Sequence, residues 1–478
     1  MVRRHSRCSV LVVLLCALSA AAFAQQETAT IAGTITDSTG AVVPRAVVVV
    51  TNVQTGITVR TTATESGSYL VPSLRPGDYS VAVESKGFQK TVRTGVTLQV
   101  AQVARIDVTL QTGGLTEAVE VVAATPLLDT LTSSRGSVID QKKIVELPLN
   151  GRDYNQLALL SPGVLPGTPR LASVNFKGVL NVNGNRTFNN VFLLDGVDNI
   201  SYSNSFRGEN VQLVQPSIEA LHEFKSQTNA YSAEYGRSSG AVVNATIKSG
   251  TNTVRGSLYE FLRNDHLDAN NFFSNALGAP KPKRERNQFG GAAGGPLVKN
   301  RTFWFGDYEG LRDLEGVPRV RQVPTAAEKA GLFSSVVADP FASGRPEFSR
   351  NAQGQWVIPR ERWDPVGAAI VALMPDPNVP NSTIFASTPV TDTRTDQFDV
   401  RVDHQVSPTM TLFGRYSFVD TLTFRPAPLE GLAEGSFNDA FGANDMRSQG
   451  LALGLTWTVP QPHSVTPASA KRLRTSLR

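Results

Sequence analysis

The chain of 478 residues carries 46 Lys and Arg against 41 Asp and Glu, and its formal charge is +5. A balance this close to neutral does not indicate a nucleic-acid-binding surface, which needs a concentrated basic patch. Both cysteines, Cys8 and Cys16, lie near the N-terminus, so the rest of the chain can form neither a disulfide framework nor a thiolate metal site. Frequent Gly and Pro between short apolar segments predict a mainly β protein with room for several domains.

Residues 1–24 have the pattern of a secretory signal peptide. Arg3, Arg4 and Arg7 precede an apolar run, and Ala22-Phe23-Ala24 supplies the small residues of a cleavage site. The apolar run, at about 13 residues, is shorter than the roughly 20 that a spanning helix needs. We therefore expect export and cleavage after Ala24.

Residues 29–112 predict a small β-sandwich, because short strands are separated at regular intervals by turn signals. Ile31 and Ile35 alternate with polar residues, as in a strand with one buried face. Pro76-Gly77 predicts a tight turn, since Pro presets φ at the second position and Gly accepts positive φ at the third.

This segment resembles a carboxypeptidase regulatory-like domain, an accessory sandwich without catalytic residues. The resemblance is carried by turn and core positions: Gly33, Asp37, Gly40, Pro44, Ala46, Gly67, Tyr69, Leu74, Pro76, Gly77, Tyr79, Val81, Gly87 and Phe88. None of the five histidines begins a His-x-x-Glu pair, so a zinc peptidase is not implied. We expect no catalytic residue, no metal site, no cofactor and no enzyme activity. The expected role is stability and spacing, and the alternative is weak carbohydrate or surface binding.

Residues 113–136 are expected to be a linker that holds a short acidic and valine-rich stretch. Its candidate functional residues are Glu117, Val119, Glu120, Val121 and Val122. The stretch resembles a TonB box, the segment that TonB-dependent receptors offer to the periplasmic protein TonB. Such recognition adds a strand to a sheet, and backbone hydrogen bonds supply its affinity. The alternative interpretation is an ordinary strand or linker.

Residues 137–250 resemble the plug domain of TonB-dependent receptors, of mixed α/β structure, through several motifs in the expected order. The motifs occupy residues 147–154, 182–186, 190–199, 231–237 and 240–250. Asp195-Gly196 predicts a turn after a short apolar strand. Pro216 predicts the start of a brief helix over residues 216–221. Neither Asp195 nor Glu234 has a partner at a readable spacing that would indicate a catalytic base.

Residues 251–459 have the alternating pattern of a transmembrane antiparallel β-barrel. Rows of apolar residues alternate with polar ones over three segments: Phe398, Val400 and Val402; Met410, Leu412, Tyr416 and Phe418; Leu451, Leu453, Leu455, Trp457 and Val459. A turn is expected at Ser407-Pro408. The segment 302–310, preceded by Gly-Gly-Pro, resembles an early strand of Oar-like receptors.

Three other segments have simpler interpretations. We expect the glycine run at residues 290–295 to mark a strand turn, and residues 320–395 to form a long extracellular loop region. The basic residues Lys281, Lys283, Arg284 and Arg286 are expected in a solvated loop, because no aromatic side chains interleave with them. A nucleic-acid partner is therefore not expected.

The resemblance implies a TonB-dependent outer-membrane receptor, of a Gram-negative-type bacterium, that takes up a scarce ligand. Its partners would be periplasmic TonB with the inner-membrane energy-coupling complex, the outer-membrane lipid, and an extracellular oligosaccharide, peptide or metal chelate. The alternative is a cell-surface adhesion protein that uses the sandwich. Residues 460–478 form an atypical basic tail, and the few strands after residue 250 lead us to expect a barrel that is truncated in this chain.

Overall fold

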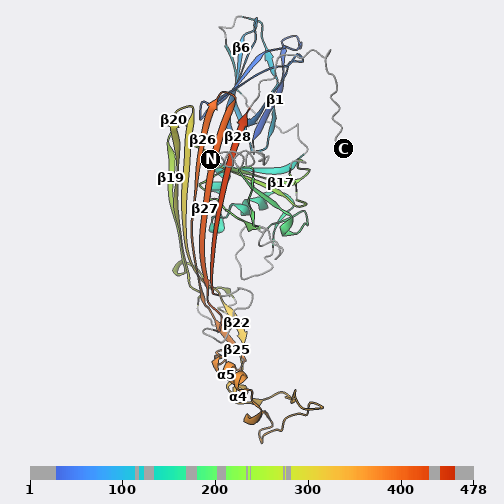
Figure 1. The fold of residues 1–478 in the computed structure, drawn as a ribbon, viewed down its shortest axis with the longest axis vertical. Helices are drawn as coiled ribbons and strands as arrows, with labels where there is room; N and C mark the ends of the chain where they lie inside the picture. The colour runs from blue at the N-terminus through green and yellow to red at the C-terminus, as the bar shows by residue number, and fades with distance from the viewer. Residues whose placement is uncertain are drawn as a thin grey trace, which may run out of the picture.

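The computed structural model describes residues 28–113, 118–122, 134–167, 180–201, 211–232, 235–236, 238–272, 275, 281–429 and 442–457. Three units follow one another along the chain: a sandwich, a central domain and a long curved sheet, here called the outer sheet (Figure 1). The predicted signal peptide, Glu117 and the basic tail lie outside the described residues. Among the described helices, none is long and apolar enough to cross a membrane.

The first unit is a β-sandwich, which confirms the predicted fold. One sheet contains β4 (Ser68–Leu74), β1 (Ala29–Asp37), β7 (Val103–Arg105) and β8 (Val108–Leu110). The other has the order β3 (Thr58–Thr62), β2 (Val47–Asn52), β5 (Gly77–Glu84), β6 (Lys90–Leu98) and β9 (Ala118–Val122). Alternate residues such as Ile31, Val48 and Val81 fill the space between the sheets. This apolar cluster takes all its buried members from residues 29–110.

Strand β9 contains four of the five residues predicted to form the TonB box. It pairs in parallel with β6, from Lys90 opposite Ala118 to Thr94 opposite Val122. The segment is therefore held in the extended conformation at an edge of the sandwich.

The central domain is built around a mixed sheet with the order β10 (Arg135–Asp140), β17 (Leu221–Asn229), β18 (Val242–Ile247), β13 (Val191–Leu194) and β14 (Val197–Asp198). Strands β13 and β18 are buried at every position, as expected for strands covered on both faces. Short elements surround this sheet: α2 (Gln141–Glu146), η1 (Asn150–Arg152), η2 (Tyr154–Leu160), η3 (Thr187–Asn189), β11 (Val164–Pro166), β12 (Leu180–Val182), β15 (Ile200–Ser201) and β16 (Val211–Gln212).

The brief helix predicted over residues 216–221 is wrong. Ile218 to Ala220 form a turn, and the chain enters β17 at Leu221. The Ser217 hydroxyl accepts a hydrogen bond from the Ala220 amide (3.0 Å). Its side chain thus satisfies one backbone donor of a single turn, and the sheet pairing of β17 takes over from Leu221 onward.

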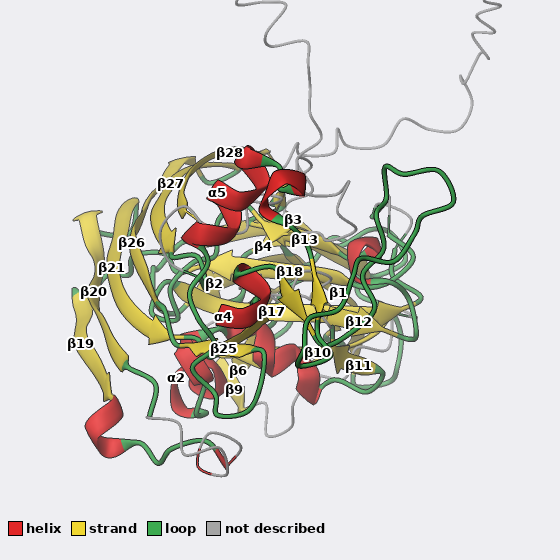
Figure 2. Ribbon diagram, turned by 90° about the horizontal axis from the view of Figure 1, so that it is seen from below, coloured by secondary structure: helices red, strands yellow, loops and turns green. Residues whose placement is uncertain are grey.

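The outer sheet is antiparallel, with strands joined in chain order. It consists of β19 (Arg255–Asn264), β20 (Arg284–Val298), β21 (Thr302–Gly316), β26 (Val390–Ser407), β27 (Met410–Arg425) and β28 (Gly442–Trp457). Figure 2 shows these strands as an arc on one side of the central domain. The predicted turn at Ser407-Pro408 joins β26 to β27. Within the described residues, β19 and β28 form the two edges of the sheet.

The alternation predicted for the outer sheet is confirmed, and it separates two faces. Leu451, Leu453 and Leu455 are 64%, 67% and 57% exposed and form part of an apolar outer face. The polar residues that alternate with the apolar rows, such as Arg401 of β26 and Arg415 of β27, are buried on the inner face. This pattern suits a sheet with lipid on one side and a packed domain on the other.

The segment between β21 and β26 forms an arm at the end of the molecule farthest from the sandwich (Figure 1). It contains β22 (Arg319–Gln322), α4 (Ala326–Lys329), β23 (Leu332–Phe333), β24 (Trp356–Val357), η6 (Arg360–Arg362), α5 (Pro365–Leu373) and β25 (Ile384–Ser387). The predicted loop region of 320–395 is too long, because β26 already begins at Val390. Thr391, Thr393 and Thr395 pair with β21 through their backbone, which an apolar pattern could not reveal.

Two further expectations for this region are wrong. Gly290 to Gly295 lie inside β20 and not in a turn. Arg284 and Arg286 also belong to β20, where their side chains are 16% and 14% exposed. Arg284 lies 3.3 Å from Asp313 of β21, so a cross-strand ion pair replaces the solvated loop. The 3-10 turn η5 (Asp265–Leu267) follows β19.

Candidate functional site between the three domains

The site begins at the turn between β13 and β14 of the central domain. Asp195 and Gly196 have φ values of 49° and 77°, which fit a tight hairpin in which both central residues are left-handed. Asp195 tolerates this conformation, and its Oδ1 accepts a hydrogen bond from the Ile247 amide (3.1 Å). The carboxylate is held at the inner face of the outer sheet.

Two arginines of the outer sheet approach this carboxylate. Arg401 of β26 places Nη1 2.8 Å from Asp195 Oδ1, and Arg415 of β27 places Nε 2.8 Å from Asp195 Oδ2. Both guanidinium groups also donate to central-domain carbonyls, Arg401 to Ile247 (3.0 Å) and Arg415 to Leu194 (3.2 Å). The three charged side chains are at most 7% exposed, so they are bound in a largely dry environment.

Two more aspartates of β26 balance the arginines. Arg401 Nε lies 3.2 Å from Asp403, and Arg415 Nη1 lies 3.9 Å from Asp399. The hydroxyl of Ser417 links Arg415 to Asp399 by hydrogen bonds. Buried charges are tolerated when they are paired in this way.

The sandwich supplies the last member. Arg75, in the turn between β4 and β5, places Nη2 2.5 Å from Asp403 and Nη1 3.5 Å from the Ser249 hydroxyl. Its guanidinium also lies over the ring of Phe413 at 5.8 Å. The six charged residues are called the ionic cluster below. They are three arginines and three aspartates, from all three units: Arg75, Asp195, Asp399, Arg401, Asp403 and Arg415.

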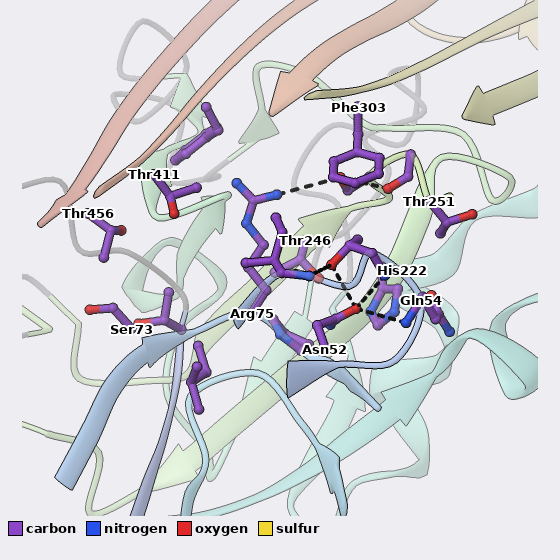
Figure 3. Close-up of a pocket in the computed structure, with 18 of the residues that line it drawn as sticks. Asn52, Gln54, Ser73, Arg75, His222, Thr246, Thr251, Phe303, Thr411 and Thr456 are labelled. Atoms are coloured by element: carbon purple, nitrogen blue, oxygen red, sulfur yellow. Dashed lines mark hydrogen bonds between the residues drawn. The ribbon is translucent and has the colours of Figure 1, made fainter. Parts of the chain in front are cut away.

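A cavity of about 140 Å³ borders the ionic cluster. Figure 3 shows side chains of the sandwich, the central domain and the outer sheet converging on it, among them Asn52, Arg75, His222 and Phe303. Burial, together with Lys248 and Arg401, lowers the pKa of His222 to about 4. His222 is therefore neutral near pH 7, and it adds no further positive charge to the site.

A second contact joins the sandwich to the central domain. Glu223 of β17 accepts a hydrogen bond from the Val100 amide, and Lys225 Nζ donates to the Ala101 carbonyl (3.1 Å). Burial raises the pKa of Glu223 to about 7, although the Val100 hydrogen bond opposes the shift. This carboxyl thus changes charge near neutral pH.

A third contact fixes the central domain to the outer sheet. Arg152 lies 3.0 Å from Glu219 and 3.8 Å from Glu309. Its guanidinium stacks over Tyr259 and Phe261 of β19, at 4.5 and 4.4 Å. Arg152 belongs to the plug-like motif at residues 147–154, so the motif provides an anchor on the sheet.

The chemistry of the site is electrostatic positioning. Among the described residues, no group of three or more His, Cys, Asp or Glu side chains could hold a metal ion. The predicted TonB-box strand pairs with β6 and contributes nothing to the ionic cluster.

Sequence reasoning missed Arg401 and Arg415 as partners of Asp195. The signal that could have found them is the row of charges Asp399, Arg401 and Asp403 on one face of an otherwise membrane-like strand.

Comparisons with known proteins match two segments of the chain. Residues 30–111 match the carboxypeptidase regulatory-like domain, and residues 246–476 match the outer membrane beta barrel domain. The chain thus combines an N-terminal segment similar to a regulatory-like sandwich with a segment similar to an outer-membrane barrel domain.

A curated relative makes the assignment more specific. Over 304 residues the chain is 31% identical to the TonB-dependent transporter Oar of Myxococcus xanthus, a match that covers 60% of this chain and 27% of the relative. The chain is homologous to part of this transporter. It spans about a quarter of the relative's length.

Solved structures resemble the chain at low sequence identity. The outer membrane transporter YddB from Escherichia coli is 12% identical, with a TM-score of 0.43, over 68% of this chain and 37% of that one. The siderophore receptor PirA from Acinetobacter baumannii is 17% identical, with a TM-score of 0.35, over 66% and 44%.

Proposed function

We propose that the chain acts as a TonB-dependent outer-membrane receptor for active uptake of a scarce extracellular ligand. The relationship to the Oar transporter supports this proposal. The central domain is its plug, and the outer sheet is the part of the barrel wall against which the plug rests. The observation that carries the proposal is the Asp195 carboxylate between Arg401 and Arg415, which holds the two parts together through groups that can separate without breaking covalent bonds.

Energy coupling is assigned to the segment at Glu117, Val119, Glu120, Val121 and Val122. Periplasmic TonB, driven by its inner-membrane complex, binds this segment by strand addition and pulls on the plug. The extended conformation of β9 supports this assignment, because strand addition needs a backbone with free edge groups. Proline substitution removes one backbone N–H and is therefore the sharpest probe of such pairing.

The ligand belongs to a class carried through the outer membrane by active transport, namely an oligosaccharide, a peptide or a metal chelate. The arm between β21 and β26 is assigned to the extracellular side, because it lies at the end of the molecule opposite the sandwich (Figure 1).

The proposal is tested by binding of the full chain to the C-terminal domain of the cognate TonB. Val121→Pro is expected to abolish binding, whereas the matched control Val121→Ala retains the backbone N–H and is expected to bind like the parent. Equal binding by the proline variant would remove this segment from energy coupling. Failure of the parent chain to bind TonB at all would contradict the proposed function.

A further inference from the structure

The contact of Asp195 with Arg401 and Arg415, which joins the central domain to the outer sheet, is called the lock below. We propose that the sandwich stabilises this lock, with Arg75 as the positioning residue. Arg75 forms an ion pair with Asp403, Asp403 with Arg401, and Arg401 with Asp195. The docked sandwich thereby keeps the central domain in place. The docking does not depend on the transport function, whereas its consequence for transport rests on the function proposed above.

The sandwich is docked at three separate places, which distinguishes it from a domain on a tether. Arg75 contacts Asp403 and Ser249, and the turn after β6 contacts Glu223 and Lys225. In the turn after β2, the Gln54 and Thr55 carbonyls accept hydrogen bonds from the backbone and side chain of Asn252 (3.0 and 2.8 Å). Contacts from three different turns restrict the orientation of the sandwich more than a single contact would.

Charge balance explains why Arg75 affects a pair that it does not touch. With Arg75 present, the ionic cluster has three positive and three negative groups. Without it, Asp403 and Asp195 must share Arg401, and the cluster holds one buried carboxylate in excess. An uncompensated buried charge weakens the remaining pairs, because each arginine is drawn between competing carboxylates.

The same domain holds the proposed energy-coupling strand. Strand β9 is joined to β6 and β6 to β5, and β5 begins two residues after Arg75. A pull on β9 is therefore transmitted through this sheet to the turn that carries Arg75. In a receptor driven from the periplasm, the sandwich would lie between the applied force and the lock.

The test is hydrogen exchange on the full chain in detergent, without TonB or ligand. Arg75→Gln is expected to speed exchange at least about tenfold, both in the docking turns around Gln54 and Val100 and at the Asp195-Gly196 turn of the central domain. Arg75→Lys, which keeps the charge, is expected to restore much of the protection. The control Arg105→Gln alters an exposed pair within the sandwich and is expected to change neither region.

Two results of the exchange experiment would overturn the inference. Faster exchange in the docking turns with an unchanged Asp195-Gly196 turn would overturn the inference, because the sandwich would then be docked without acting on the lock. Unchanged exchange in both regions of the Arg75→Gln variant would overturn it as well. To guard against a general loss of folding, Gln54→Cys with Asn252→Cys forms a crosslink that is expected to restore protection in the Arg75→Gln background. Loss of TonB binding alone would count against the proposed function and not against this inference.

Discussion

Arg401 and Arg415 lie directly opposite each other on the neighbouring strands β26 and β27. Like charges at such a cross-strand position destabilise a sheet. Here the Asp195 carboxylate of the central domain lies 2.8 Å from each guanidinium group, so it reduces the repulsion between the two arginines.

Removal of the Asp195 charge is expected to weaken this contact strongly. Asp195→Asn leaves two buried arginines without their shared partner, and the expected loss is about 3–5 kcal/mol in the free energy of central-domain docking. The measurement is the urea concentration at which the central domain becomes accessible to protease. Asp268→Asn, which breaks an exposed pair with Arg263, is the control and is expected to change the free energy by less than about 1 kcal/mol. Equal midpoints for the two variants would contradict the role given to Asp195.

The contact between the sandwich and the central domain is expected to weaken as pH rises. Burial raises the pKa of Glu223 from 4.5 to about 7, so the docked state binds more protons than the undocked state between these values. The contribution of Glu223 to docking stability is therefore fully present below pH 4.5 and is lost as pH rises through about 7. Lys225 on the same strand and Asp140 on β10 are the charged groups that act on this carboxyl, and they act in opposite directions.

The measurement must distinguish the effect of Glu223 titration on docking from the effect of His222 titration. The lowered pKa of His222 gives the opposite slope, because the docked state binds fewer protons between pH 4 and 6.5. We therefore expect the difference in docking midpoint between the parent and Glu223→Gln to change between pH 5 and 8, with the parent losing more stability. A difference that is constant over this range would show that Glu223 does not titrate in the contact.

The sandwich is expected to fold on its own as residues 29–112. Its buried apolar cluster takes no member from the other units, and Tyr69 donates a buried hydrogen bond to the Ile106 carbonyl (2.7 Å). Tyr69→Phe should lower the free energy of unfolding by about 1 kcal/mol. Thermal melts followed by circular dichroism should show one cooperative β-type transition. A random-coil spectrum for the parent segment would rule out an autonomous domain.

Local patterns were sufficient to predict several parts of the fold. The alternation of Leu451, Leu453 and Leu455 predicted the apolar face of β28, and Asp195-Gly196 predicted a tight turn. Both signals arise within a few residues, where side-chain period and backbone preference act directly. The helix expected after Pro216 failed because the pairing of β17 outweighed a weak local preference.

The ionic cluster could not be predicted in the same way. Asp195 and Arg401 are 206 positions apart, and their contact depends on how the central domain lies against the sheet. The alternation of β26 indicated only that Asp399, Arg401 and Asp403 share a face. It could not show that this face is covered by protein, nor that Arg75 reaches it from a third unit.

The distribution of charge among the three units has a consequence for any solute that travels along the inner face of the outer sheet. The sheet itself contributes Asp399, Arg401, Asp403 and Arg415, two anions and two cations, whereas Asp195 and Arg75 belong to the parts that would move. Once those parts withdraw, the four residues leave a zwitterionic strip with no net charge. Such a strip offers hydrogen bonds to polar solutes of either sign, and it neither traps an anion nor repels a cation.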